Sequence, residues 1–350
     1  MQKNSTQTTI QEMLTTTPPA FSAEEVVVYA ASQYGIHASA QPLVSERDQN
    51  FRLDAQDGRR YTLKISNEAE QQKVIDFQNQ ALLHVEKHDP SLPLPRVIPN
   101  LHGQLHCALL EEGKTHYVRV LSWLPGSLLE ETGSSAGLAN RLGQLLARLG
   151  LALKGFEHPG SNPPLLWDMK RAAGLRDLLP HIEEPGLQQL VKQVLDRFVS
   201  AIEPSLESLR TQVIHCDMNP HNVLMDAKNP GKITGLIDFG DMVKSPLIMD
   251  LAIAAAYQLG DGDDPLSNAL PMIAGYHSIR PLDDFEIEIL PDLVKTRLIT
   301  SLLISAYRVT LFPENREYLM VSREPAIRSL TGLSRMATTD AVERIRAACV

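Results

Sequence analysis

The chain has 350 residues, 43% of them hydrophobic, and a formal net charge of −9 at pH 7. This composition is typical of a globular protein with one or two domains, and the acidic balance argues against a nucleic-acid partner, whose phosphates need clustered Lys and Arg. Three scattered cysteines argue against a disulfide framework and favour the cytoplasm, and no apolar run is long enough for a membrane-spanning helix.

The first residues lack the features of a targeting segment. Residues 1–20 are rich in Thr and Gln, without the basic start and long apolar run of a signal peptide, so we expect a disordered tail. Ser22 and Glu25 then have the spacing of a capping box, which predicts a helix that continues to about Tyr34.

The following segments favour a sheet. Alternating apolar and polar residues predict strands at 39–45, 50–55, 60–66, 105–110 and 117–123. Asp57-Gly58 is suited to the tight turn of a hairpin between the second and third of these. Apolar residues at helical spacing predict one helix over 68–88, which three prolines end.

From Gly137 onward the apolar residues recur with the period of a helix. We expect helices at 137–153, 186–209, 246–258, 265–278, 283–311 and 324–347. The pattern therefore predicts an α+β chain with two lobes. A small β-rich N-lobe would cover 21–123, and a larger, mainly helical C-lobe would cover 124–350.

Two polar segments in the C-lobe each follow a strand-like run. Residues 215–222 read His-Cys-Asp-Met-Asn-Pro-His-Asn, and residues 238–241 read Asp-Phe-Gly-Asp. Phosphoryl transfer needs an Asp that orients and deprotonates a hydroxyl, and an Asn and a second Asp that hold magnesium. The segments predict these roles: base Asp217, bracing residue His215, and magnesium ligands Asn222 and Asp238.

The motif HxDxxxxN, followed about twenty residues later by DFG, resembles the protein-kinase-like phosphotransferases. Cys216 stands where protein kinases carry Arg, which favours the aminoglycoside phosphotransferase and choline kinase branch. Within that branch, residues 235–241 and 250–257 most resemble hydroxylysine kinases, and the similarity covers residues 22 to about 335. The resemblance implies a bilobal protein-kinase-like fold, ATP and Mg²⁺ as cofactors, and a small-molecule hydroxyl acceptor.

The resemblance also implies a nucleotide site in the N-lobe. Lys64 takes the place of the strand lysine that grips the α and β phosphates. Gln78 falls where the family carries the acidic partner of this lysine, and the alternatives on the same helix are Glu68, Glu70 and Asp76. Residues 45–51 contain no glycine-rich phosphate loop. We expect the connector to contact adenine through Ser122, Trp123 and Leu124.

Further acidic and aromatic residues are candidates for binding the acceptor. Asp241 follows the DFG segment, where it is suited to a second magnesium ion or to an ammonium group of the acceptor. Trp167 and Asp168 lie in a Pro-rich loop and offer a ring and a carboxylate to a cation. Asp250 is expected to cap a helix or to support the catalytic loop, and an exposed turn is expected at Asp261, Asp263 and Asp264.

The predicted activity is transfer of the γ-phosphate of ATP to a hydroxyl of a small, amine-bearing metabolite such as hydroxylysine. Choline, ethanolamine, homoserine, an aminoglycoside and a sugar stay open as acceptors, as does a homodimer. A zinc site of His215, Cys216 and His221 is weaker, because magnesium better suits Asn and Asp oxygens. A different class also stays open: a nucleotide-binding regulatory module, or the partner domain of an aminotransferase system, with little turnover.

Overall fold

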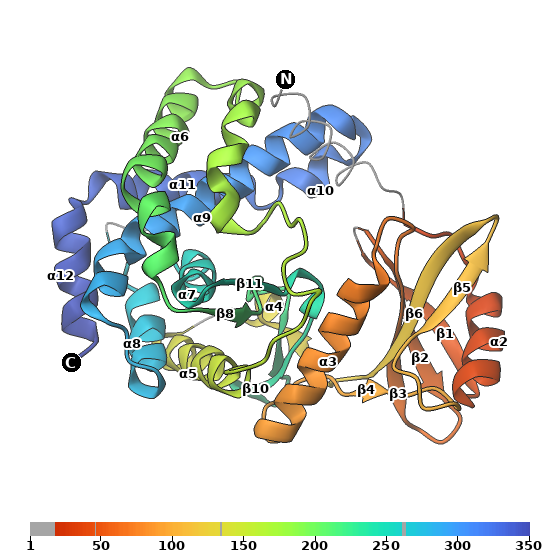
Figure 1. Ribbon diagram of the computed structural model, residues 1–350. Helices are drawn as coiled ribbons and strands as arrows, with labels where there is room; N and C mark the ends of the chain where they lie inside the picture. Colours follow the sequence, from red (N-terminus) through yellow and green to blue (C-terminus); the bar gives the residue numbers. More distant parts are fainter. Residues whose placement is uncertain (1–17, 46, 134, 261–263) are drawn as a thin grey trace. The chain divides into compact units, whose positions relative to one another are not determined.

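The computed structural model describes residues 18–45, 47–133, 135–260 and 264–350 (Figure 1). The expected tail therefore lies outside the described residues except for positions 18–20. The chain divides into two compact units. The first comprises Met1–Pro125, His158–Pro163 and Gly235–Ile237, and the second comprises Gly126–Glu157, Pro164–Thr234 and Asp238–Val350.

Helix α2 (Ala23–Tyr34) opens the described part of the first unit. Its N-terminus carries the predicted capping box, in which the Ser22 side chain accepts the Glu25 N–H and the Glu25 side chain accepts the Ser22 N–H. Each bond satisfies an N–H that the first helical turn leaves without a partner. Gly35, at φ 66°, ends the helix in the left-handed conformation that glycine adopts without steric cost.

An antiparallel sheet forms the centre of the first unit. Its strands are β1 (Ala38–Leu43), β2 (Gln49–Ala55), β3 (Arg60–Ile65), β4 (Val97–Ile98), β5 (Cys107–Glu111) and β6 (Lys114–Ser122). The order is β1-β2-β3-β6-β4, and β5 also pairs with β6. The expected hairpin joins β2 and β3, with Gly58 at φ 82° in its turn. The short strand β4 was not predicted.

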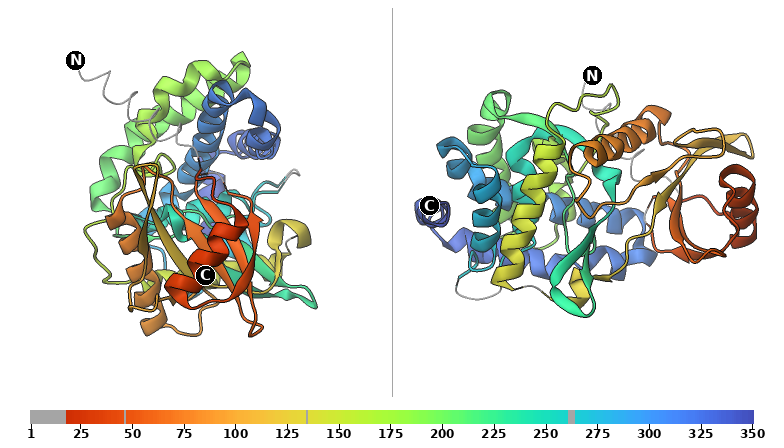
Figure 2. Two further views of the ribbon diagram at one scale, coloured as in Figure 1. Left: turned by 90° about the vertical axis from the view of Figure 1, so that its right-hand side faces the viewer. Right: turned by 90° about the horizontal axis from the view of Figure 1, so that it is seen from below.

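One helix lies on each face of this sheet (Figures 1 and 2). Helix α2 packs on the face formed by alternate strand residues, and the shared core includes Val26, Ala30, Phe51, Leu53, Leu63, Ile65, Val118 and Val120. Helix α3 (Gln72–His88) lies on the opposite face. Because strand side chains alternate, Lys64 lies on the α3 face although Leu63 and Ile65 lie in the α2 core.

Five short strands hold the two motif segments. Strands β7 (Ser127–Leu128), β9 (Val223–Asp226) and β10 (Asn229–Leu236) form one sheet, and β8 (Thr211–Ile214) pairs with β11 (Val243–Pro246). The first motif follows β8 and the second precedes β11. Ile214, the last residue of β8, is paired with Val243, the first residue of β11. Because the strands are antiparallel, the start of the first motif segment lies beside the end of the second.

The second unit is otherwise helical. Its α-helices are α4 (Leu129–Thr132), α5 (Ala136–Ala152), α6 (Pro185–Arg197), α7 (Leu247–Ala256), α8 (Ala269–Ile279), α9 (Asp284–Leu311), α10 (Arg316–Met320), α11 (Arg323–Arg335) and α12 (Thr338–Ala348). The 3₁₀ helices are η1 (Met169–His181), η3 (Glu203–Ser208), η4 (Phe239–Asp241) and η5 (Pro313–Asn315), and η2 (Phe198–Ile202) is a π-helix. Within the described ranges, no helix has the length and apolar character needed to span a bilayer.

Two expected helices are interrupted. The prediction of one helix over 186–209 was wrong, because α6 passes into the π-helical η2 and the 3₁₀ turn η3, where Pro204 has no N–H for a continuing ladder. The prediction of one helix over 324–347 was also wrong. Met336 and Ala337 are extended, and this break lets α11 and α12 both pack against α9.

Helices α5 and α8 cross at two glycines. A Cβ atom on Gly143 of α5 would overlap the Met272 carbonyl oxygen, and one on Gly275 of α8 would overlap the Asn140 carbonyl oxygen. The Asn140 side chain also donates a hydrogen bond of 3.2 Å to the Pro271 carbonyl. The two backbones therefore approach closely only because neither glycine carries a side chain.

Candidate active site

The segment after β8 is held by a buried carboxylate. Asp250 of α7 is 2% exposed and accepts the Cys216 N–H at 2.9 Å and the His215 N–H at 3.3 Å. Cys216 has φ 67°, which is uncommon for a residue with a side chain. Asp250 thus supports the loop of the first motif segment, which was one of its two expected roles; the N-cap of α7 is Pro246.

Asn222 is bound directly to the candidate base. Its Nδ2 donates to the Asp217 carbonyl oxygen at 2.9 Å and to the Asp217 Oδ2 at 2.7 Å. The His215 Nδ1 accepts the Asp217 N–H at 3.2 Å, so this ring nitrogen carries no proton. Residues 215 to 222 thus form a loop closed on itself, with Asp217 contacted from both ends.

The second motif begins with a residue in the left-handed region. Asp238 has φ 59°, and its Oδ1 accepts the Gly240 N–H at 3.2 Å. Phe239 is 3% exposed, and its ring meets the His215 ring edge-on with the centroids 4.7 Å apart. His215 therefore contacts both motif segments, and its bracing role stays a prediction.

The charges around Asp217 change its proton affinity. Burial raises the pKa of Asp217 to about 7, and the like charge of Asp241 adds to the effect. Asp238 acts in the same direction with a smaller effect, whereas the positive charge of Arg297 opposes it. Three of the predicted residues, Asp217, Asp238 and Asp241, thus lie near enough to interact electrostatically.

Arg297 of α9 was not predicted. It is 3% exposed, and its Nη2 lies 3.0 Å from the Tyr257 hydroxyl and 3.3 Å from the Asp217 Oδ1. Its Cζ lies 5.2 Å from the ring centroid of Trp167. Burial lowers the pKa of Arg297, but Tyr257 and Asp217 more than offset this, and the net shift is upward. No local signal marked it, because α9 also buries the charged side chains of Glu286 and Asp292.

Trp167 and Asp168 have different surroundings. The Trp167 ring lies beside Arg297, and Arg297 in turn contacts the candidate base Asp217. The Asp168 side chain is fully buried, and its Oδ1 accepts a 2.8 Å hydrogen bond from Ser245 while its Oδ2 lies 2.9 Å from the Lys170 Nζ. Asp168 also caps η1. Its contacts therefore join the Trp167 loop to β11.

In the first unit, Lys64 lies on the face of the sheet that α3 covers. It is 9% exposed, and the strand register places it opposite Asn50 of β2 and Arg119 of β6. Gln78 of α3, the predicted partner of Lys64, accepts a 2.6 Å hydrogen bond from the Arg119 Nη2. Arg119 also donates to Asn79 at 3.1 Å. Arg119 is thus a second buried cation beside Lys64, and it was not predicted from the sequence.

The expected adenine connector is partly committed to the sheet. The Ser122 N–H donates to the Arg96 carbonyl at 2.8 Å, and the Trp123 N–H donates to the Arg60 carbonyl at 3.2 Å. The Ser122 hydroxyl accepts the Arg96 N–H. Among the described residues, the Leu124 N–H has no such partner. Of the three connector residues, Leu124 is therefore the one whose backbone N–H is available to a ligand.

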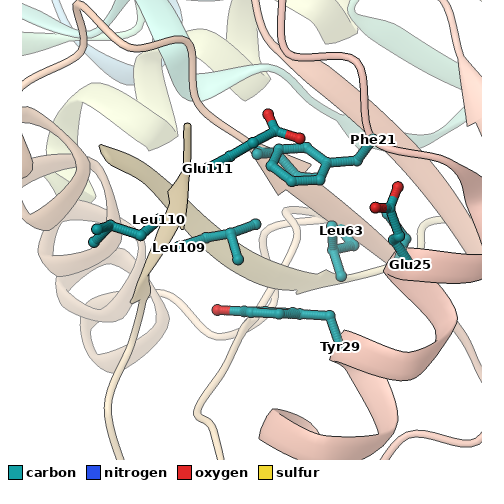
Figure 3. A pocket seen from close by; sticks show the side chains of 9 residues that line it. Phe21, Glu25, Tyr29, Leu63, Leu109, Leu110 and Glu111 are labelled. Carbon is teal, nitrogen blue, oxygen red and sulfur yellow. The ribbon is translucent and has the colours of Figure 1, made fainter. Parts of the chain in front are cut away.

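A pocket of about 280 Å³ lies in the first unit, between α2 and the sheet (Figure 3). The pocket is lined on one side by Glu25 and Tyr29 of α2 and by Phe21, which precedes that helix. On the other side it is lined by the strand residues Leu63, Ile65 and Leu109. Since Leu63 and Ile65 face the pocket, Lys64 between them faces the other side of the sheet. This pocket is therefore distinct from the candidate nucleotide site.

The zinc alternative gains no support. In the part of the chain that the structure describes, no group of three His, Cys, Asp or Glu side chains is arranged to hold a metal ion. Cys216 is 1% exposed, and burial raises the pKa of its thiol well above the usual value, which disfavours the thiolate that zinc needs. Asp264, expected in an exposed turn, has a half-exposed side chain that pairs with Arg344, while Asp261 and Asp263 lie outside the described residues.

Comparisons with known proteins identify the family of the chain. Residues 39–282 match the model of the phosphotransferase enzyme family. The hydroxylysine kinase of Danio rerio is 31% identical over 341 residues, which cover 93% of this chain and 95% of that protein. A homoserine kinase of Gluconobacter oxydans is 33% identical over 195 residues, which cover 54% of this chain and 58% of that protein. Since these relatives are kinases, the alternative of a regulatory module is not favoured.

Solved structures support the fold. The amicoumacin kinase in complex with AMP-PNP, Ca²⁺ and Ami aligns with a TM-score of 0.66 at 16% identity, covering 91% of this chain and 97% of that one. This likeness confirms the expected α+β, protein-kinase-like fold, and the family match adds the chemistry of phosphate transfer. The chain belongs to the phosphotransferase enzyme family and is a small-molecule kinase.

Proposed function

We propose that this kinase transfers the γ-phosphate of ATP to a hydroxyl of a small, amine-bearing acceptor, and that hydroxylysine is the first acceptor to test. The observation that carries the proposal is the pair of hydrogen bonds from Asn222 to Asp217, beside the carboxylates of Asp238 and Asp241. A base, two oxygen ligands and a further carboxylate are what phosphate transfer to an amine-bearing alcohol requires.

Asp217 acts as the general base in this proposal. A pKa raised to about 7 places its proton affinity near neutral pH, where the carboxyl is partly ionised and is a stronger proton acceptor than an ordinary Asp. Asn222 and His215 orient it, since they contact its side chain and its N–H respectively. The contribution of these residues is therefore positioning of the hydroxyl as well as proton acceptance.

The residues present suit a magnesium ion. The Asn222 amide nitrogen is used by Asp217, so its Oδ1 is the atom available to a cation, and Asp238 supplies a carboxylate. Magnesium takes oxygen ligands and is held by one or two side chains together with phosphate oxygens, which it neutralises during transfer. Burial and then the like charges of Asp241 and Asp238 raise the pKa of Asp217, and a divalent cation would relieve the repulsion among these carboxylates.

The nucleotide is proposed to bind through the first unit. Lys64 is buried on β3 with Arg119 beside it, which gives the α and β phosphates two neighbouring positive charges. The Leu124 N–H, with the carbonyl groups of Ser122 and Trp123, is proposed to contact adenine. The AMP-PNP in the complex of the amicoumacin kinase supports ATP as the donor.

The relatives support the choice of acceptor. The Danio rerio protein is a hydroxylysine kinase and the Gluconobacter oxydans protein a homoserine kinase, and both named substrates carry an amine and a hydroxyl. Asp241 is proposed to pair with the ammonium group because its charge is already felt at Asp217. ATP as donor and three free thiols also support the expected cytoplasmic location.

An acceptor panel tests this function. The purified chain is incubated with ATP, with or without Mg²⁺, and with each of hydroxylysine, homoserine, ethanolamine, choline and an aminoglycoside, while ADP formation is followed. We expect magnesium-dependent ADP formation that rises with hydroxylysine. Lysine, which lacks the hydroxyl, is the matched control. ADP formation at the same rate with lysine as with hydroxylysine would argue against a hydroxyl acceptor.

A further inference from the structure

We propose that Arg297 binds a carboxylate of the acceptor, so that the enzyme selects hydroxy amino acids over amino alcohols. This inference rests on the proposed function, since it names the class of acceptor at that same site. The evidence is the burial of Arg297, the lack of acceptors for two of its three nitrogen atoms among the described residues, and its contact with Asp217.

Only one nitrogen of the guanidinium has partners in the described part of the protein. Nη2 contacts the Tyr257 hydroxyl at 3.0 Å and the Asp217 Oδ1 at 3.3 Å. For Nε and Nη1, no hydrogen-bond acceptor is present among the described residues. Because the side chain is only 4% exposed, these donors are shielded from bulk water. Buried donors nearly always have an acceptor, which indicates that a ligand supplies one here.

A carboxylate is the ligand that fits best. Arginine presents its N–H groups in a planar fork that matches the two oxygens of a carboxylate, and such charge-assisted bonds are about twice as strong as neutral ones. The rings of Trp167 and Tyr257, with centroids 5.2 and 5.6 Å from Cζ, limit the positions that the guanidinium can adopt. Arg297 is therefore held in place before the ligand binds.

The contact with Asp217 sets the distance between carboxylate and hydroxyl. Since Nη2 meets Asp217, a group on the other nitrogens of the same guanidinium lies within the length of a short side chain from the base. A hydroxy amino acid spans that distance with its hydroxyl at Asp217 and its carboxylate at Arg297. Its ammonium group, at Asp241, balances the carboxylate, so the bound acceptor adds little net charge to a site already rich in carboxylates.

Matched acceptors test the inference without any substitution. Homoserine is compared with 3-aminopropan-1-ol, and hydroxylysine with 1,5-diaminopentan-2-ol; each second compound lacks only the carboxylate. A charge-assisted bond of this kind predicts a KM about 10-fold to 100-fold lower for at least one amino acid than for its analogue. Equal KM values within both pairs would refute the inference while leaving the kinase activity intact.

The variant Arg297→Gln separates carboxylate binding from an effect on the base. Its loss of positive charge alters Asp217 for every acceptor, so any change in kcat is shared within a pair. Carboxylate binding predicts in addition that the KM ratio of the pair falls towards one, and that Arg297→Lys restores part of it. A fall in kcat with an unchanged KM ratio would assign Arg297 to the positioning of Asp217 alone.

Calorimetric titration with the same four compounds separates failure of this inference from failure of the proposed function. Wild-type protein with Mg²⁺ and AMP-PNP is expected to bind the amino acid of a pair more tightly than the analogue. Such a preference without phosphate transfer would overturn the proposed function and keep the carboxylate site. Equal affinity within both pairs, or no binding of the amino acids, would overturn the inference.

Discussion

Asn222 donates its amide hydrogen to Asp217 over 2.7 Å, which joins a proposed metal ligand directly to the proposed base. The same amide contacts the Asp217 carbonyl, so both the side chain and the backbone of Asp217 are oriented by one residue. A change at Asn222 should therefore affect orientation of the acceptor hydroxyl as well as metal binding, whereas a change at Asp217 should affect mainly the hydroxyl.

We predict that Asp217→Asn lowers kcat by roughly 10²-fold to 10⁴-fold, the range for a lost general base. The amide has nearly the same shape but does not accept the hydroxyl proton. Affinity for Mg·ATP should change little. Steady-state kinetics check this, with Asp226→Asn as the control because Asp226 lies at the end of β9 and pairs with Lys232. Activity of the Asp217 variant equal to that of the control would exclude Asp217 as the base.

Asp238→Ala should remove most of the magnesium-dependent affinity for ATP, since this carboxylate is proposed to hold the ion that bridges the phosphates. Lys64→Met should weaken ATP binding more than acceptor binding. Calorimetric titration with Mg·ATP measures both effects. Lys114→Met is the control, because Lys114 is an exposed lysine that pairs with Glu68. Unchanged nucleotide affinity in both site variants would rule out the proposed nucleotide contacts.

The pH profile should report Asp217. Its pKa of about 7 means that kcat/KM falls as the pH decreases through about 7, because the protonated carboxyl accepts no further proton. The charge of Asp241 is one cause of that upward shift, so Asp241→Asn should move the fall to lower pH. Profiles of kcat/KM for Mg·ATP in wild type and variant measure this. An acidic limb at the same pH in both proteins would contradict the stated cause.

Gly143→Ala should destabilise the helical unit. The added Cβ meets the Met272 carbonyl oxygen, and such overpacking costs about 1–3 kcal/mol, which exceeds the helix propensity that alanine gains. Gly137→Ala is the matched control in the same helix, since its Cβ would meet only the flexible end of Arg141, and it should be neutral or slightly stabilising. Urea unfolding compares the two. Equal stability of both variants would show that α5 and α8 tolerate a wider separation.

Features that depend on neighbouring residues could be predicted from the sequence. The capping box at Ser22, the hairpin turn at Gly58 and the order of strands and helices follow from local backbone preferences and apolar periodicity. The two motif segments were recognised for the same reason, because each is a short run with fixed spacing. Their mutual approach follows from the pairing of Ile214 with Val243, which the sequence alone does not display.

Features that depend on distant residues could not be predicted. Arg297 is 80 positions from Asp217 in the chain, and nothing in its own helix marks it as a contact of the catalytic loop. Arg119 became evident only when the strand register placed it opposite Lys64 and its side chain met Gln78 of α3. The break at Met336 was hidden because the apolar spacing on both sides suits a helix, and packing against α9 decides the outcome.

Mass spectrometry of the acceptor shows whether the chain places phosphate on a hydroxyl. Hydroxylysine is incubated with Mg·ATP and either the wild-type chain or Asp217→Asn, and the products are analysed for phosphate on the hydroxyl oxygen. We expect O-phosphohydroxylysine and ADP in equal amounts with the wild type, and a large loss of both with the variant. ADP formation without a phosphorylated product for any acceptor of the panel, or equal product from both proteins, would contradict it.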